Sequence, residues 1–444
     1  MKFVLFIFFL IFGVALTQTS AQTRKVFPYQ YKVQDLPNGL RVVTVPTDYK
    51  NLVSLYIVVG AGSRNEVEAN KSGYAHFFEH LMFRGSENFA PGRFDEVMKK
   101  AGASSNAYTS DDRTVYHETF AKEDLDAVMR LEADRFQRLK FSEEQYKTEA
   151  GAVLGEYNKN SASPTFKMYE VLRETAFKDH TYSHTTMGYL DDIKNYPSQY
   201  DYAWQFFNRF YRPENTTIIV VGDIKEPEVV QMAKNYWGDW KAGDYKQKIP
   251  VEPAQKEPRK QHIEWASQTL PFVTVAYRAP AFSETDKDKA ALDLMAAIAF
   301  GENSDVFQKL VLQEQKAVFV SPEFDNHIDP ELFSVWAQVK DEKDLNYVRD
   351  EIVKTYEKFT KELIPAKQLD ETRSRLRYGF SMAMNSNDAI AGTLARFIAL
   401  RRSPETIDKV FAMYDSITPA DIRQAAEKYF KQNNQTIVTL ATKK

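Results

Sequence analysis

Cysteine is absent from the 444-residue sequence, so neither a disulfide nor a lipid-modified N-terminal cysteine is possible. Charge of either sign is nearly balanced, because 58 Lys and Arg face 61 Asp and Glu. This balance gives no reason to expect nucleic acid or an anionic membrane surface as a partner. A composition of 43% hydrophobic and 27% charged residues argues against both disorder and a polytopic membrane protein. The length exceeds that of one ordinary core, so we expect at least two domains.

The first residues have the features of a targeting segment. Lys2 precedes an apolar run from Phe3 to Leu16, which is too short to span a bilayer comfortably. The following Thr19-Ser20-Ala21 offers small residues for cleavage. We predict a secretory signal peptide at residues 1–21, and therefore export across an inner membrane into the periplasm. A retained membrane anchor is the alternative.

Two of the seven histidines occur in one short run with a glutamate between them, His76-Phe77-Phe78-Glu79-His80. On a helix each residue turns by about 100°, so His80 and Glu79 lie roughly 40° and 60° from His76, and all three side chains share one face. Two imidazoles at this spacing suit one Zn²⁺ ion, and the carboxylate would meet a water at the metal. The pattern is H-x-x-E-H, the reverse of the zinc-protease motif H-E-x-x-H.

A catalytic zinc usually takes three protein ligands, so we expect a third ligand elsewhere. Glu149 and Glu156 are the candidates, on a helix that we predict to begin with Ser142 as N-cap. They are seven residues apart and share a helix face to within about 20°, so one could bind the metal while the other supports it. The alternative is that both are surface acids. His180 and His184 are also four apart, but DHTYSHTTMG has little helical character and predicts a loop.

The order of elements repeats along the chain. Residues 197–221 and 419–440 each consist of a proline, an amphipathic helix, a polar turn and a β-prone run, which indicates two halves of like architecture. We predict an α+β fold with two similar α/β sandwich domains, each a mixed sheet covered by helices. The expected domains are 22–240, which carries the histidine motif, and 263–444, which lacks it, joined by a charged and proline-bearing linker at 241–262.

The run GAGSRNEVEANKSGYAHFFEHLMFRGS resembles the pitrilysin and insulin-degrading-enzyme family, which includes mitochondrial processing peptidase. These enzymes are the peptidases with the inverted zinc motif. The resemblance implies one Zn²⁺ per chain, held by His76, His80 and Glu156. It also implies that Glu149 supports the metal site, since the family has a glutamate seven residues before the third ligand.

The resemblance further implies the chemistry. Glu79 would act as the base that takes a proton from a zinc-activated water and returns it to the leaving amine. Asn106, Ala107 and Tyr108, in NAYTSDD, would form an edge strand along which an extended peptide binds. The implied function is a zinc metalloendopeptidase acting on peptides or unfolded protein segments.

One feature departs from the family pattern. Members that act alone carry an arginine and, seven residues later, a tyrosine, whereas Val311 and Val318 occupy these positions here. Valine cannot donate a hydrogen bond to an oxyanion. We therefore predict half of a clamshell dimer, in which this chain bears the metal and a homologous partner supplies the Arg/Tyr pair. A homodimer is the alternative assembly, and a non-catalytic subunit of a larger complex is the alternative function. A binding protein with a structural zinc is disfavoured, because Glu79 would then have no purpose.

Overall fold

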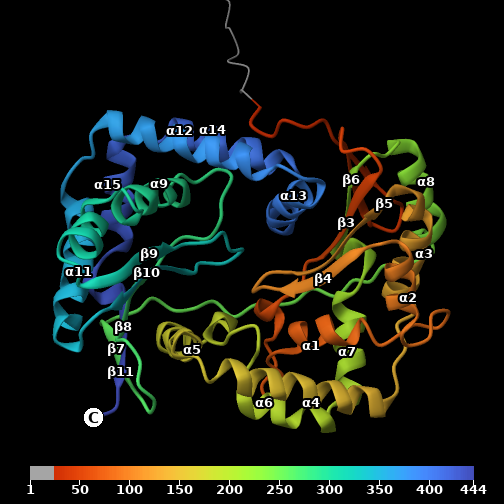
Figure 1. Cartoon of the computed structure of the whole chain (residues 1–444), viewed down its shortest axis with the longest axis horizontal. Helices are drawn as coiled ribbons and strands as arrows, with labels where there is room; N and C mark the ends of the chain where they lie inside the picture. The colour runs from red at the N-terminus through yellow and green to blue at the C-terminus, as the bar shows by residue number, and fades with distance from the viewer. Residues whose placement is uncertain (1–24) are drawn as a thin grey trace, which may run out of the picture.

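The computed structural model describes residues 25–444, so the predicted signal peptide at 1–21 lies outside the described residues. Two mixed β-sheets, each covered by helices, face each other across the molecule (Figure 1). This arrangement confirms the predicted fold class. None of the helices in residues 25–444 combines the length and the apolar character needed to cross a membrane.

The first half contains a six-stranded sheet in the order β1-β2-β6-β3-β5-β4. Its strands are β1 (Lys32–Asp35), β2 (Arg41–Pro46), β3 (Leu52–Val59), β4 (Ser104–Thr109), β5 (Thr114–Ala121) and β6 (Thr216–Gly222). Its helices are α1 (Tyr74–Leu81), α2 (Arg93–Lys100), α3 (Leu125–Gln137), α4 (Glu143–Asn160), α5 (Pro164–Ala176), α6 (Leu190–Asn195), α7 (Tyr200–Phe210) and α8 (Glu226–Trp237). Strand β3 is almost wholly buried because β6 and β5 flank it and both of its faces are covered. Strand β4, in contrast, is at the sheet edge.

The second half contains a five-stranded sheet in the order β7-β11-β8-β10-β9. Its strands are β7 (Arg259–Trp265), β8 (Phe272–Arg278), β9 (Ala317–Glu323), β10 (Leu332–Val339) and β11 (Gln435–Thr442). Its helices are α9 (Asp288–Phe300), α10 (Asp305–Phe307), the π-helix η6 (Gln308–Gln313), α11 (Leu345–Lys361), α12 (Ala366–Ala383), α13 (Asn387–Arg401), α14 (Glu405–Ser416) and α15 (Pro419–Tyr429). The parallel pair β7–β11 corresponds to β2–β6, and the edge hairpin β9–β10 corresponds to β4–β5.

The segment between the halves is docked and shorter than expected. Strand β7 begins at Arg259, so residues 259–262 belong to the second sheet rather than to the linker. Residues 240–258 form neither helix nor strand. The carboxylate of Glu252 nevertheless accepts hydrogen bonds from the backbone N–H groups of residues 178–180, at 2.8–3.0 Å. The linker is therefore anchored to the first half.

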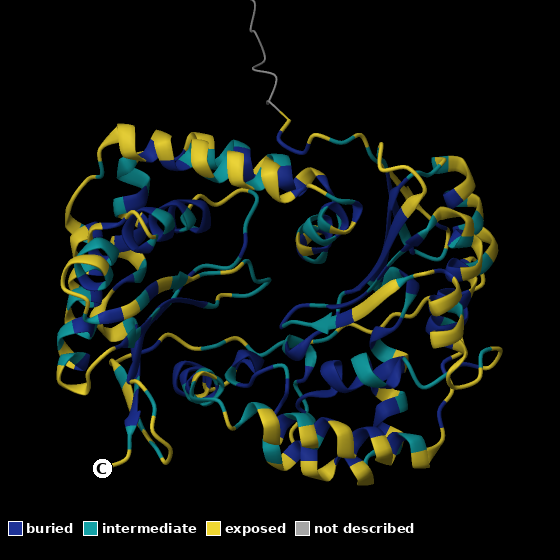
Figure 2. Cartoon of the chain, viewed as in Figure 1, coloured by how far each residue is buried: buried dark blue, intermediate teal, exposed yellow. Residues whose placement is uncertain are grey.

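One helix of each half packs on the sheet of the other half. Helix α5 of the first half packs on β7 and β11, where Met168 and Leu172 join Val438 in a buried cluster. Helix α13 of the second half packs on β3 and β6, where Ile390 and Leu394 join a cluster with the central strands of the first sheet. Figure 2 shows the buried residues gathered along the sheets and the faces of the helices that cover them.

Candidate metal centre and catalytic site

Helix α1 carries the histidine motif and is held at its N-terminus by a carboxylate from the loop that precedes it. The residue before the helix is Gly73 at φ 85°, which has no side chain with which to cap the helix. Glu66 takes that role, because its carboxylate accepts hydrogen bonds from the backbone N–H of Gly73 at 2.5 Å and of Ala75 at 2.7 Å. Burial is the main cause of its pKa lying well above the ordinary value. A carboxyl group at a helix N-terminus satisfies N–H groups that would otherwise have no partner.

Three potential metal ligands converge where α1 meets α4. Oε2 of Glu156 lies 3.7 Å from Nε2 of His76 and 3.4 Å from Nε2 of His80. Among residues 25–444, these three form the only group of His, Asp and Glu side chains close enough to share one ion. Zinc bonds of about 2.0–2.2 Å in a tetrahedron separate ligand atoms by roughly 3.3–3.6 Å. The observed spacing therefore fits a zinc ion.

The pKa shifts of His76 and His80 are also compatible with a bound cation. Burial, and then the charge of His80, lower the pKa of His76 to about 3, so its imidazole is neutral and keeps a lone pair for a metal. The Nδ1 atom of the same ring is buried and has no hydrogen-bond partner. Burial alone would lower the pKa of His80, but Glu149, Glu156 and Glu79 raise it instead. A cation among these carboxylates is therefore favoured.

Glu149 lies beside Nδ1 of His80, whereas Glu156 lies beside Nε2 of the same ring. Oε2 of Glu149 is 3.5 Å from Nδ1 of His80 and its Oε1 is 3.0 Å from Nε of Arg84. Its side chain is only 5% exposed, whereas that of Glu156 is 38% exposed. A buried carboxylate on the far nitrogen of a ligating histidine fixes the orientation of the ring.

Glu79 is half-buried beside the three ligands and is oriented by the strand β4. Thr109 Oγ1 donates a hydrogen bond of 2.7 Å to Oε2 of Glu79. Burial raises the pKa of Glu79, although the bond from Thr109 and the charge of His80 oppose this shift. Sequence analysis missed both Thr109 and Glu66. The first is the last residue of the predicted edge strand, whereas no local pattern points to the second.

The predicted substrate-binding residues lie on β4, which within residues 25–444 pairs only with β5 and leaves its outer edge without a neighbouring strand. Asn106 is exposed, Ala107 is buried and Tyr108 is half-buried. Ala107 faces the core that contains α1, while Tyr108 packs against the cluster that contains α13. The free backbone edge is therefore adjacent to Glu79.

Other histidines lie away from the three ligands. His117 stacks on Tyr56 on the sheet face that α13 covers. His180 lies 3.0 Å from Asp329 of the second half, and Nδ1 of His184 lies 2.9 Å from the carbonyl oxygen of Thr185.

The two valines of the predicted Arg/Tyr positions lie in the second half. Val311 belongs to the π-helix η6 and packs against the second core, and Val318 is 43% exposed on the edge strand β9. Neither side chain offers a hydrogen-bond donor.

Comparison with known proteins identifies both halves. The model of "Insulinase (Peptidase family M16)" matches residues 41–189, and that of "Peptidase M16 inactive domain" matches residues 199–376. "Zinc protease PqqE" of Helicobacter pylori is 29% identical over 91% of both chains. A probable mitochondrial-processing peptidase subunit beta of Arabidopsis thaliana is 26% identical, over 90% of this chain and 76% of that protein.

Solved structures agree with this assignment. The crystal structure of a protease from Helicobacter pylori superimposes with a TM-score of 0.86 at 28% identity and covers 93% of this chain and 99% of the other. A putative M16-like peptidase from Alicyclobacillus acidocaldarius has the same fold, with a TM-score of 0.81 at 17% identity over 94% and 99% of the two chains. With both halves matched by family models and relatives aligned over nine-tenths of its length, the chain belongs to peptidase family M16, the insulinase family.

Proposed function

We propose that this chain is a zinc metalloendopeptidase that hydrolyses peptides or unfolded protein segments. The observation that carries the proposal is the convergence of His76, His80 and Glu156, whose ligand atoms lie within 4.8 Å of one another, beside the carboxylate of Glu79. The relative in Helicobacter pylori is named as a zinc protease, which supports zinc as the metal. We propose one Zn²⁺ per chain at these ligands.

The chain's own residues would share the work as follows. His76, His80 and Glu156 would hold the Zn²⁺, which when bound lowers the pKa of water and polarises a peptide carbonyl. Thr109 occupies Oε2 of Glu79, which leaves Oε1 free to accept the proton of the attacking water. Glu79 would then return this proton to the nitrogen of the leaving amine. Peptide-bond hydrolysis requires both transfers.

We propose that the substrate binds as an additional strand on the free edge of β4. Asn106, Ala107 and Tyr108 lie on this edge strand, where alternate residues direct their backbone N–H and C=O groups away from β5. The N–H of Ala107 donates to Oδ1 of Asn106, a bond that a bound peptide would replace, and backbone hydrogen bonds give affinity with little dependence on sequence. Such binding requires an extended segment, so flexible peptides and unfolded segments are the expected substrates.

We propose that a homologous partner completes the site. Val311 and Val318 cannot supply donors to a developing oxyanion, so the Arg/Tyr pair would come from the second chain of a clamshell dimer, in a heterodimer or, alternatively, a homodimer. We also propose two domains, the first at 22–240 and the second beginning with β7 at Arg259 rather than at residue 263, and export to the periplasm directed by residues 1–21.

The test is hydrolysis of a quenched fluorescent peptide by the purified chain, with zinc measured on the same sample and Glu79→Gln as the matched control. We expect about one zinc per chain in both proteins, as three protein ligands require, and turnover only with Glu79. Weak turnover that a homologous partner restores in equimolar mixture would support the heterodimer. Full activity of the chain alone would refute the need for a partner. A chain with neither zinc nor turnover would favour the non-catalytic subunit.

A further inference from the structure

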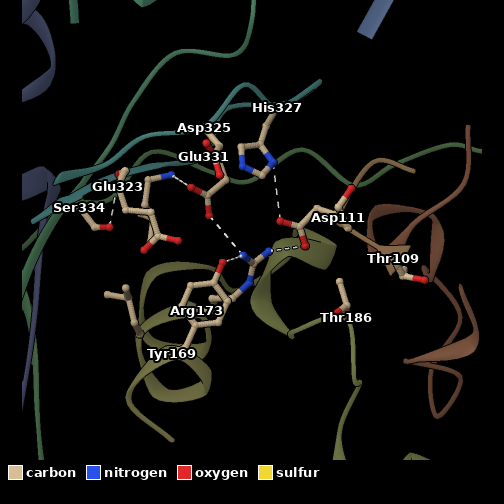
Figure 3. A pocket seen from close by; sticks show the side chains of 13 residues that line it. Thr109, Asp111, Tyr169, Arg173, Thr186, Glu323, Asp325, His327, Glu331 and Ser334 are labelled. Carbon is tan, nitrogen blue, oxygen red and sulfur yellow. Dashed lines mark hydrogen bonds and ion pairs between the residues drawn. The ribbon is translucent and has the colours of Figure 1, made fainter. Parts of the chain in front are cut away.

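The tips of two equivalent hairpins meet between the halves. One tip is the turn 110–113 that joins β4 to β5, and the other is the loop 324–331 that joins β9 to β10. Figure 1 shows both hairpins pointing toward the centre of the molecule from opposite sides. Figure 3 shows His327 of the second half beside Asp111 of the first, and Arg173 between Asp111 and Glu331.

Asp112 is the main attachment of the loop to the first half. It is 3% exposed, and its Oδ2 accepts a hydrogen bond of 2.9 Å from the backbone N–H of Ile328. Its Oδ1 accepts a bond of 2.8 Å from the hydroxyl of Tyr182. Nδ1 of His327 lies 3.6 Å from both Asp111 and Asp112, so one imidazole faces the carboxylates of two successive residues.

Arg173 ties the same turn to the second sheet. Its side chain, on α5, is only 1% exposed, and it donates to Asp111 at 3.0 Å and lies 3.5 Å from Glu331. A second pair crosses between the halves nearby, because Nε of Arg64 lies 2.6 Å from Asp329. Buried charges of this kind hold a fixed geometry, because removing one member leaves the other unpaired.

The turn 110–113 directly follows Thr109, the residue that orients Glu79. Thr109 ends β4 and donates to Glu79, and the turn begins at the next residue, where the N–H of Ser110 bonds to the carbonyl of Arg113. Strand β4 has little apolar anchorage, since Ala107 is its only buried residue. Cavities of about 230 and 840 Å³ border the tips on either side. The polar contacts at the tip therefore act together with the pairing of β4 and β5 to fix the position of Thr109.

We propose that His327 is a positioning residue for the hydrolytic site, which acts by clamping the turn 110–113 so that Thr109 meets Glu79. The proposal rests on the proposed function, because Glu79 is the base of that reaction. The second half would thus help to position the site, although the proposed metal ligands all belong to the first half. The loop 324–331 is connected to Glu79 through Asp111, Asp112 and Thr109.

The first test measures hydrogen exchange of the peptide spanning 104–113 in the wild-type chain and in His327→Leu, by mass spectrometry. We expect faster exchange in that peptide and unchanged exchange in α11, on the far side of the second sheet. Unchanged exchange in 104–113 would overturn the proposal. Since this test needs no activity, it stands even if the chain proves inactive, which would refute the proposed function instead. If His327→Leu does not fold, His327→Gln replaces it.

The second test is a double-mutant cycle on peptide hydrolysis with His327→Leu and Thr109→Val. We expect each single substitution to lower kcat about 10- to 100-fold at nearly constant KM. The double variant should be no slower than the slower single variant, because both changes remove the same hydrogen bond to Glu79. Multiplicative losses would show that His327 acts by another route. His327→Arg, which keeps the positive charge, should recover part of kcat, and His262→Leu on the exposed face of β7 is the control.

Discussion

Thr109 donates its hydroxyl hydrogen to Oε2 of Glu79 over 2.7 Å, and so an edge strand orients the proposed base. Replacing Thr109 by Val removes the donor and keeps the shape of the side chain. We expect kcat for peptide hydrolysis to fall about 10- to 100-fold, as for other groups that orient a metal site, with the zinc content unchanged. Steady-state kinetics and metal analysis on one preparation check this, with Thr360→Val on α11 as control. An unchanged kcat would contradict the role of Thr109.

Glu149 supports His80 from the side away from the proposed metal. Glu149→Ala should weaken zinc binding about 10- to 100-fold, because the ring of His80 loses the carboxylate that fixes its orientation. Competition with a fluorescent chelator measures the affinity. Glu144→Ala removes an exposed glutamate of the same helix and should leave the affinity unchanged. Equal affinities for all three proteins would show that Glu149 is dispensable for the metal.

Glu66 caps the helix that bears both histidines. Glu66→Ala leaves the backbone N–H groups of Gly73 and Ala75 buried without an acceptor, which should lower the free energy of unfolding by about 2–4 kcal/mol. Chemical denaturation measures the loss. Glu68→Ala breaks a partly exposed pair with Arg209 and should cost only about 0–1 kcal/mol. Similar losses in the two variants would argue against the capping role.

His327 should make stability depend on pH on the alkaline side. Burial alone would lower its pKa, but the nearby carboxylate of Asp112 and the charges of Glu331 and Asp111 raise it from 6.5 to about 9. Since the pKa in the folded state is the higher one, the stabilisation is fully present below about pH 6.5 and is lost as pH rises through about 9. A shift of this size corresponds to roughly 3 kcal/mol.

Thermal unfolding between about pH 6 and 10 measures this effect. The Tm of the wild type should fall with rising pH by more than that of His327→Gln, which has no imidazole to titrate. Parallel curves for the two proteins would show that His327 is not charged in the folded chain. His262→Gln, on the exposed β7, should follow the wild type.

The sequence predicts the parts of the site that depend on local spacing. His76, Glu79 and His80 share one face of a helix because of the 3.6-residue turn, and Glu149 and Glu156 share a face of α4 for the same reason. Which glutamate binds the metal came only from the family resemblance. In the folded chain the two side chains differ in exposure, since that of Glu156 is 38% exposed and that of Glu149 is 5% exposed.

Contacts between distant segments are not encoded in any local pattern. His327 is an isolated histidine in the sequence. Even Glu66, only seven residues before Gly73, has no recognisable capping pattern with the helix that it caps. The repeated order of elements predicts two packed halves. It does not predict that α5 and α13 each pack on the sheet of the other half, because an amphipathic helix does not specify which sheet covers its apolar face. Tertiary packing decides each of these features.

The crossing of α5 and α13 makes the chain equivalent to a domain-swapped pair that is joined by one covalent tether. A proteolytic cut within 240–258 would sever that tether but leave Ile390 and Leu394 buried on the first sheet, and Met168 and Leu172 on the second. The two fragments should therefore remain a noncovalent complex after cleavage. Either half expressed alone would expose one apolar face of its sheet. The unit that folds is therefore the whole chain rather than each half.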